Sequence, residues 1–131
     1  MDQETDSDVF EEMPAWPWLL SRAKAEVETL IAGLPEELRE PAKRLPVHYE
    51  PAPDPKRHRG IEPDTLGLFV GNPLAETHLA HGDVAAHIIL FLENNWFGDE
   101  AEYKEEVRIT YFHELGHYLG LEEDDLEDRG L

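Results

Sequence analysis

A pair of histidines near the end of the chain constrains the fold most, because both side chains have to lie on one face of a helix. Residues 113–123 read H-E-x-x-H-x-x-G-x-x-E. Histidines four positions apart in a helix project from the same face and can bind one metal ion. Glu114 is rotated by about 100° around the helix axis from His113, so its carboxylate can reach a metal-bound water molecule without being a metal ligand.

The glycine of this motif predicts where the helix ends. Gly120 can adopt the left-handed conformation that stops a helix, so that the chain turns back toward the metal. The turn would bring Glu123 in as a third, oxygen ligand beside His113 and His117. The pattern therefore predicts a zinc ion that keeps one open coordination position, with Glu114 as a base next to it.

Apolar residues around the motif predict a long amphipathic helix from about residue 101 to Gly120. They recur at helical spacing and form a stripe across the helix from the histidines: Val107, Tyr111, Leu115, Tyr118 and Leu119. One face of the helix would pack into a core, while the other holds both imidazoles toward a cleft. The acidic residues early in this segment suit the positive end of the helix dipole.

The remaining segments indicate a small α+β domain. One helix is expected to begin at Pro17 and stop at Gly33. A second one is expected over residues 35–45, where Pro41 would kink or divide it. Short strands are expected at 47–50, 66–70 and 88–92. This order predicts a three- to four-stranded mixed sheet that packs with the N-terminal helices and the C-terminal motif helix.

Length and composition indicate one folded domain. Residues 1–14 are mostly acidic or polar, so we expect a disordered tail there and a single domain over 15–131. The chain has no cysteine, which excludes thiolate metal sites and disulfides and fits the cytoplasmic location that we expect. The first residues lack the pattern of a secretory signal, and no apolar run is long enough to span a bilayer.

The net charge of −19 argues against nucleic-acid and membrane partners. Its simplest role is solubility, but the negative field would also favour cationic substrates. Carboxylates alone could bind a hard ion such as calcium, whereas two histidines favour zinc. The basic residues 56–59 belong to a proline-rich loop that we expect to be solvated.

The other histidines match no compact metal-binding motif. His78, His81 and His87 lie close together in the sequence, but their spacing supports no ligand assignment. His48 belongs to an expected strand and is interpreted as structural. The chain also lacks the motifs of serine hydrolases and nucleotide-binding proteins.

The chain resembles the small bacterial zincin-like metallopeptidases, a minimal-zincin family with the motif H-E-x-x-H-x-x-G-x-x-D. The resemblance covers most of residues 18–130, and its segments are LPEEL at 34–38, LGLFVG at 66–71, IILF at 88–91 and the motif helix. It implies a zincin-like fold with His113 and His117 as zinc ligands and Glu114 as the catalytic glutamate. Where the family usually has aspartate, this chain has Glu123, and a shift of one residue would give the role of third ligand to Asp124.

The resemblance implies a zinc metallopeptidase that hydrolyses peptides or proteins, with Glu114 as general base. Only 11 residues follow Gly120, so the cleft would be open on one side, and a protein partner that completes it is a further expectation. One alternative is a non-catalytic zinc- or peptide-binding module on a zincin scaffold. Another is an acidic interaction domain in which the motif is accidental.

Overall fold

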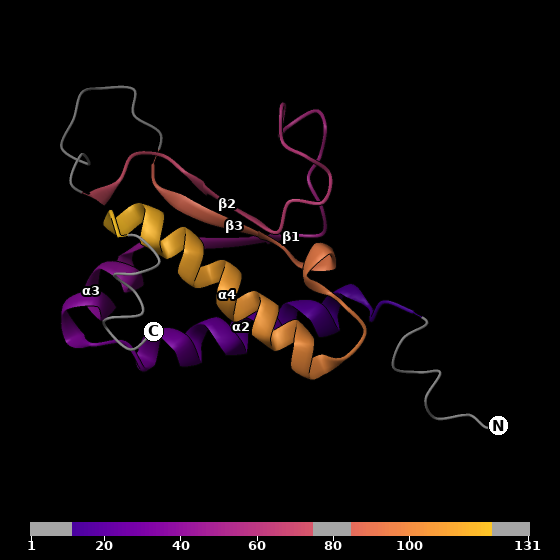
Figure 1. The fold of residues 1–131 in the computed structure, drawn as a ribbon, viewed down its shortest axis with the longest axis horizontal. Coiled ribbons are helices and arrows are strands. Elements are labelled where there is room, and N and C mark those ends of the chain that lie inside the picture. The colour runs from indigo at the N-terminus through magenta and orange to yellow at the C-terminus, as the bar shows by residue number, and fades with distance from the viewer. Residues whose placement is uncertain (1–11, 75–84, 122–131) are drawn as a thin grey trace.

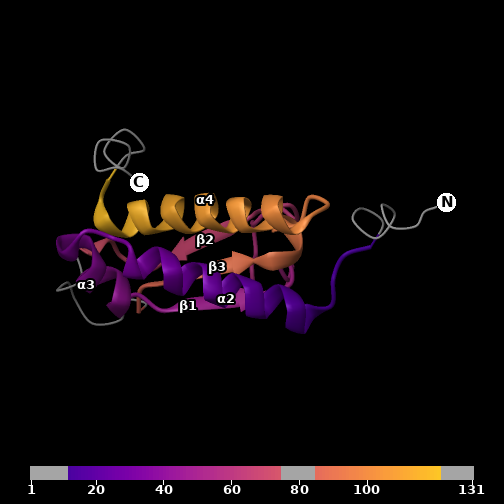
Figure 2. The same cartoon turned by 90° about the horizontal axis from the view of Figure 1, so that it is seen from below.

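The computed structural model describes residues 12–74 and 85–121, in which a helical layer packs on one face of a small sheet (Figure 1). The elements are α2 (Trp16–Ala32), α3 (Glu36–Arg44), β1 (Val47–Glu50), β2 (Gly67–Val70), β3 (His87–Phe91), the 3-10 helix η2 (Leu92–Asn95) and α4 (Glu100–Leu119). Helices α2 and α4 lie side by side along the molecule, as the view in Figure 2 also shows. The predicted α+β class is therefore confirmed.

The sheet has the mixed topology that the sequence predicts. Within the described residues it has three strands in the order β1-β3-β2, with β1 parallel and β2 antiparallel to β3. The central strand β3 carries the most buried side chains, Ile88, Leu90 and Phe91 among them. Leu92, which we expected at the end of this strand, instead begins η2.

The strand β2 is an edge of the sheet, next to α4.

Helix α4 begins and ends where its sequence predicts. The Asp99 side chain caps its first turn by accepting a hydrogen bond of 2.8 Å from the Glu102 backbone N–H. At the other end Gly120 is left-handed, with φ 73°, and the Leu121 N–H donates to the Gly116 carbonyl at 2.8 Å. The motif helix therefore stops at Gly120.

The apolar stripe of α4 lies at the centre of the hydrophobic core. Val107, Tyr111 and Leu115 are fully buried, Tyr118 is nearly so, and Leu119 is partly buried. They pack with residues of α2, α3 and β3, of which the most buried are Leu19, Ala23, Val27, Leu38, Ala42, Ile88 and Leu90. Because this stripe is buried, the opposite face of α4, which carries the two motif histidines, is exposed to solvent.

Two expectations about the first half of the chain need correction. Helix α3 runs through Pro41, so the proline does not divide it, while the alternative of a kink stays a prediction; the proline removes one backbone donor. Leu38 and Ala42 pack this helix against the hydrophobic core. In the loop after β1, His58 is not solvated: it is 9% exposed and packs edge-on against Phe91, with ring centroids 5.3 Å apart.

Among the described helices, none is long and apolar enough to cross a membrane.

Gly67 lets β2 pack directly against α4. A Cβ atom at this position would lie 2.5 Å from the Thr110 Cγ2 atom, closer than two carbon atoms can approach. Thr110 cannot easily turn away, because its hydroxyl donates to Asn95 Oδ1 at 3.1 Å. The Asn95 amide in turn donates to the carbonyls of Leu66 and Phe91, at 3.2 and 2.9 Å. This contact fixes how close β2 lies to the motif helix.

We predict that Gly67→Ala destabilises the protein by about 1–3 kcal/mol, because the new methyl group overlaps the Thr110 methyl group in a closely packed interface. Urea unfolding followed by circular dichroism measures this loss. The matched control is Gly67→Ala combined with Thr110→Ser, which removes the opposing methyl group and keeps the hydroxyl. The double variant should recover most of the stability, and equal instability of both variants would contradict this assignment.

Two buried tyrosines of α4 allow a second prediction, in which the stability effects of the same substitution at two positions are compared. The Tyr103 hydroxyl donates to the Leu19 carbonyl at 2.8 Å, whereas the Tyr111 hydroxyl has no partner among the described residues. Tyr103→Phe should therefore lower the free energy of unfolding by about 1 kcal/mol, while Tyr111→Phe should leave it unchanged or raise it. Thermal unfolding of both variants checks the prediction, and a larger loss for Tyr111→Phe would refute it.

Candidate metal centre

The two histidines of the motif meet on the exposed face of α4. His113 and His117 are one helical turn apart, and their Nε2 atoms lie 3.2 Å from each other. The ring centroids are 4.7 Å apart and the rings are nearly perpendicular, at 83°. Both side chains are exposed, because the opposite face of the helix is buried in the core.

This geometry fits two ligands of one tetrahedral zinc ion. Zinc binds imidazole nitrogen at about 2.0–2.1 Å, so two such ligands at the tetrahedral angle lie about 3.3 Å apart. The observed separation of 3.2 Å between the Nε2 atoms is close to that value. Imidazole is also a preferred donor for zinc, so that both the distance and the chemistry of the pair suit this metal.

The third ligand that the sequence predicts lies outside the described residues. Within residues 12–74 and 85–121, no group of three or more histidine, aspartate or glutamate side chains comes together at a possible metal site. Glu123 and its alternative Asp124 belong to the segment after Leu121, which is not described. The left-handed Gly120 is consistent with a return of the chain, but both assignments stay predictions.

Glu114 is placed differently from the histidines on either side of it in the motif. It is only 8% exposed, on the flank of α4 that faces β2. Burial raises the pKa of its carboxyl group, while the histidines His113 and His117 and a hydrogen bond from the Phe69 backbone N–H act to lower it. The net shift is upward. A carboxylate with a raised pKa beside two exposed imidazoles is compatible with the general-base role that the sequence predicts for Glu114.

The hydrogen-bond pattern of β2 explains why the backbone N–H of Phe69 is the donor to the Glu114 carboxylate. In an antiparallel pair, consecutive residues alternate between pointing their backbone groups toward the partner strand and away from it. The Phe91 N–H donates to the Leu66 carbonyl at 3.0 Å, so the groups of Leu66 face β3, and those of Gly67 and Phe69 face outward. The outward N–H of Phe69 is the one that reaches Glu114.

Sequence reasoning missed these contributions of β2. A backbone N–H leaves no signature in the sequence, so Phe69 could not be identified as a partner of Glu114. Gly67 offered a weak signal, since a glycine inside a strand often marks a close backbone approach. Its contact, Thr110, lies 43 positions later in the sequence and is visible only in the folded chain.

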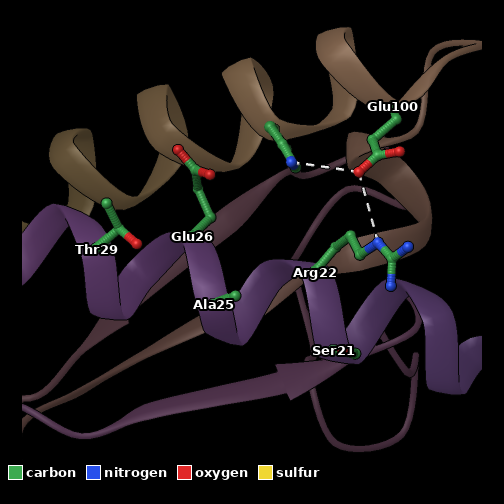
Figure 3. Close-up of a pocket in the computed structure, with 7 residues that line it drawn as sticks. Ser21, Arg22, Ala25, Glu26, Thr29 and Glu100 are labelled. Carbon is green, nitrogen blue, oxygen red and sulfur yellow. Dashed lines mark ion pairs between the residues drawn. The ribbon is translucent and has the colours of Figure 1, made fainter.

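A polar hollow between α2 and α4 lies away from the motif (Figure 3). It has a volume of about 430 Å³ and is lined by Ser21, Arg22, Ala25, Glu26, Thr29, Glu100 and Lys104. Arg22 and Lys104 both pair with Glu100, at 3.5 and 3.2 Å. Both basic groups are therefore already paired with one carboxylate, and the hollow lies at the end of α4 that is far from His113.

Within residues 12–74 and 85–121, no other histidine joins the pair on α4. His48 and His87 lie on the sheet, where they contact each other. His78 and His81 lie in residues 75–84, outside the described part of the chain. The metal centre that the sequence predicts therefore rests on His113, His117 and the undescribed third ligand.

Comparison with known proteins identifies the family of this chain. A search of the curated proteins finds no match. The sequence model of the zincin-like metallopeptidases matches residues 42–131, which is more than half of the chain and includes β1, β2, β3 and α4. The chain therefore belongs to the zincin-like metallopeptidase family.

Proposed function

We propose that this protein is a zinc-dependent metallopeptidase with its active site on the exposed face of α4. The observation that carries this proposal is the convergence of the His113 and His117 Nε2 atoms, 3.2 Å apart, beside the buried Glu114. We assign His113 and His117 as zinc ligands, with Glu123 as the third and Asp124 as its alternative. Membership of the zincin-like metallopeptidases supports the same activity.

The zinc ion, when bound, would act as a Lewis acid that polarises a peptide carbonyl and activates water for attack. The imidazoles of His113 and His117 hold the ion on an open helix face, where a substrate can approach. Neutral imidazole is the form that binds metal, so both rings have to lose their second proton before the site assembles.

Glu114 would move the proton in this reaction. Its carboxylate accepts a proton from the attacking water and delivers it to the nitrogen of the leaving amine. The Phe69 N–H occupies only one of the lone pairs of the carboxylate, so others stay available for water. Burial beside β2 restricts the rotation of the side chain, which keeps the base in position.

The substrate of this proposal is an extended segment of a peptide or protein. The strand β2 is an edge of the sheet and runs next to α4, so a peptide that lies beside it would pass the histidine pair while the Phe69 N–H stays bound to Glu114. The net charge of −19 would favour substrates with basic side chains by raising their local concentration.

We predict that Glu114→Gln abolishes hydrolysis and leaves zinc binding unchanged. Glutamine keeps an oxygen that accepts the Phe69 N–H, so the fold should tolerate it, but it cannot take a proton. Loss of a general base typically costs about 10²- to 10⁴-fold in rate. The measurement is cleavage of a fluorescence-quenched peptide library by the zinc-loaded protein, together with its zinc content.

The matched control is Glu106→Gln, which removes the same charge from the same helix two turns before the motif. This variant should cleave the library at the rate of the unchanged protein. Equal activity of Glu114→Gln and the unchanged protein would contradict the proposed mechanism. Zinc binding without any hydrolysis by the unchanged protein would favour the non-catalytic module instead.

A further inference from the structure

A second pair of histidines lies on the sheet, on the face that points away from α2 and α4. Ile88 and Leu90 of β3 point into the core, so the alternate residues His87 and Ile89 point to the opposite face. His48 of β1 is paired in register with Ile89 and lies on that same outer face. The two histidines thus come from neighbouring strands, far apart in the sequence but adjacent in the sheet.

The rings of this pair are about as close, and as nearly perpendicular, as those of the motif histidines. The ring centroids of His48 and His87 lie 4.9 Å apart with an interplanar angle of 87°. The corresponding values for His113 and His117 are 4.7 Å and 83°. In that pair the two Nε2 atoms lie 3.2 Å apart. His48 is exposed and His87 is half-buried, so solvent ions can reach the pair.

The hydrogen bond of His87 determines which nitrogen of its neutral ring carries the lone pair. The Nδ1 atom lies 2.9 Å from the Ala85 carbonyl oxygen, which can only accept a hydrogen bond. In the neutral ring Nδ1 therefore carries the proton, and the lone pair is on Nε2. Donation from one ring nitrogen to a backbone carbonyl is the usual way in which proteins orient a metal-binding histidine.

We propose that His48 and His87 form a second metal site, specific for ions that prefer imidazole, such as Zn²⁺, Ni²⁺ and Cu²⁺. Among the described residues no third histidine or acidic side chain completes the site, so the proposed site has two ligands from this part of the chain, with water in the remaining positions. The site is therefore weaker than a three-ligand centre and exchanges its metal readily. A bound ion would join β1 to β3 near the start of both strands.

This proposal is independent of the proposed peptidase activity, since the helix pair and the sheet pair lie on opposite sides of the sheet. The high negative charge of the chain raises the local concentration of every cation, so charge alone does not select the metal. Selection comes from the imidazoles, because Mg²⁺ prefers oxygen ligands whereas Zn²⁺, Ni²⁺ and Cu²⁺ bind nitrogen well.

The test uses the full chain with His113→Ala and His117→Ala, so that the motif pair no longer binds metal. Calorimetric titration with ZnCl₂ should then show one remaining site. Adding His48→Ala or His87→Ala should lower the zinc affinity of the remaining site at least about tenfold. Even the loss of a group that only supports a metal ligand typically lowers metal affinity by about tenfold. Copper should bind more tightly than zinc, following the usual order of divalent metals.

Titration with MgCl₂ is the control for non-specific attraction, and its heats should not change when His48 or His87 is replaced. Circular dichroism verifies that the variants fold, which is expected because both positions lie at the surface. Zinc should also raise the melting temperature of the His113→Ala, His117→Ala protein, and this shift should vanish without His48. Unchanged zinc affinity after replacement of His48 and of His87, or no zinc binding before it, would overturn the proposal.

Discussion

The close packing of β2 on α4 is the contact on which the arrangement of the site depends. Gly67 has no side chain at the point where Thr110 approaches, so the edge strand can lie directly against the helix. Two residues further along the strand, and four further along the helix, the same approach brings the Phe69 N–H to the Glu114 carboxylate. The Asn95 side chain supports this contact by binding Thr110 and the ends of both neighbouring strands.

The electrostatics of α4 explain why a metal would suit this helix. A carboxylate that is only 8% exposed loses most of its hydration, and one backbone N–H compensates only part of that loss. The pKa of Glu114 is accordingly raised. The chain as a whole is strongly negative, so it supplies little positive charge to offset this cost. A cation held by His113 and His117 would favour the charged form of Glu114 from one side, while β2 shields it on the other.

The sequence predicted those features that depend on local periodicity and on turn chemistry. The bounds of α4, its buried stripe and the left-handed Gly120 follow from spacing alone, and so does the convergence of His113 and His117. Features that depend on distant segments could not be predicted in this way. The burial of His58 against Phe91 and the proximity of His48 to His87 arise from strand pairing and loop packing.

Zinc analysis of the purified, untagged protein tests most directly whether His113 and His117 hold a zinc ion. After zinc is added back and the protein is dialysed against metal-free buffer, the account predicts about one tightly bound zinc ion per chain. His113→Ala should lose this ion, while His48→Ala, which removes a histidine from the sheet, should keep it. Absence of zinc from the unchanged protein, or retention of zinc by His113→Ala, would contradict the account.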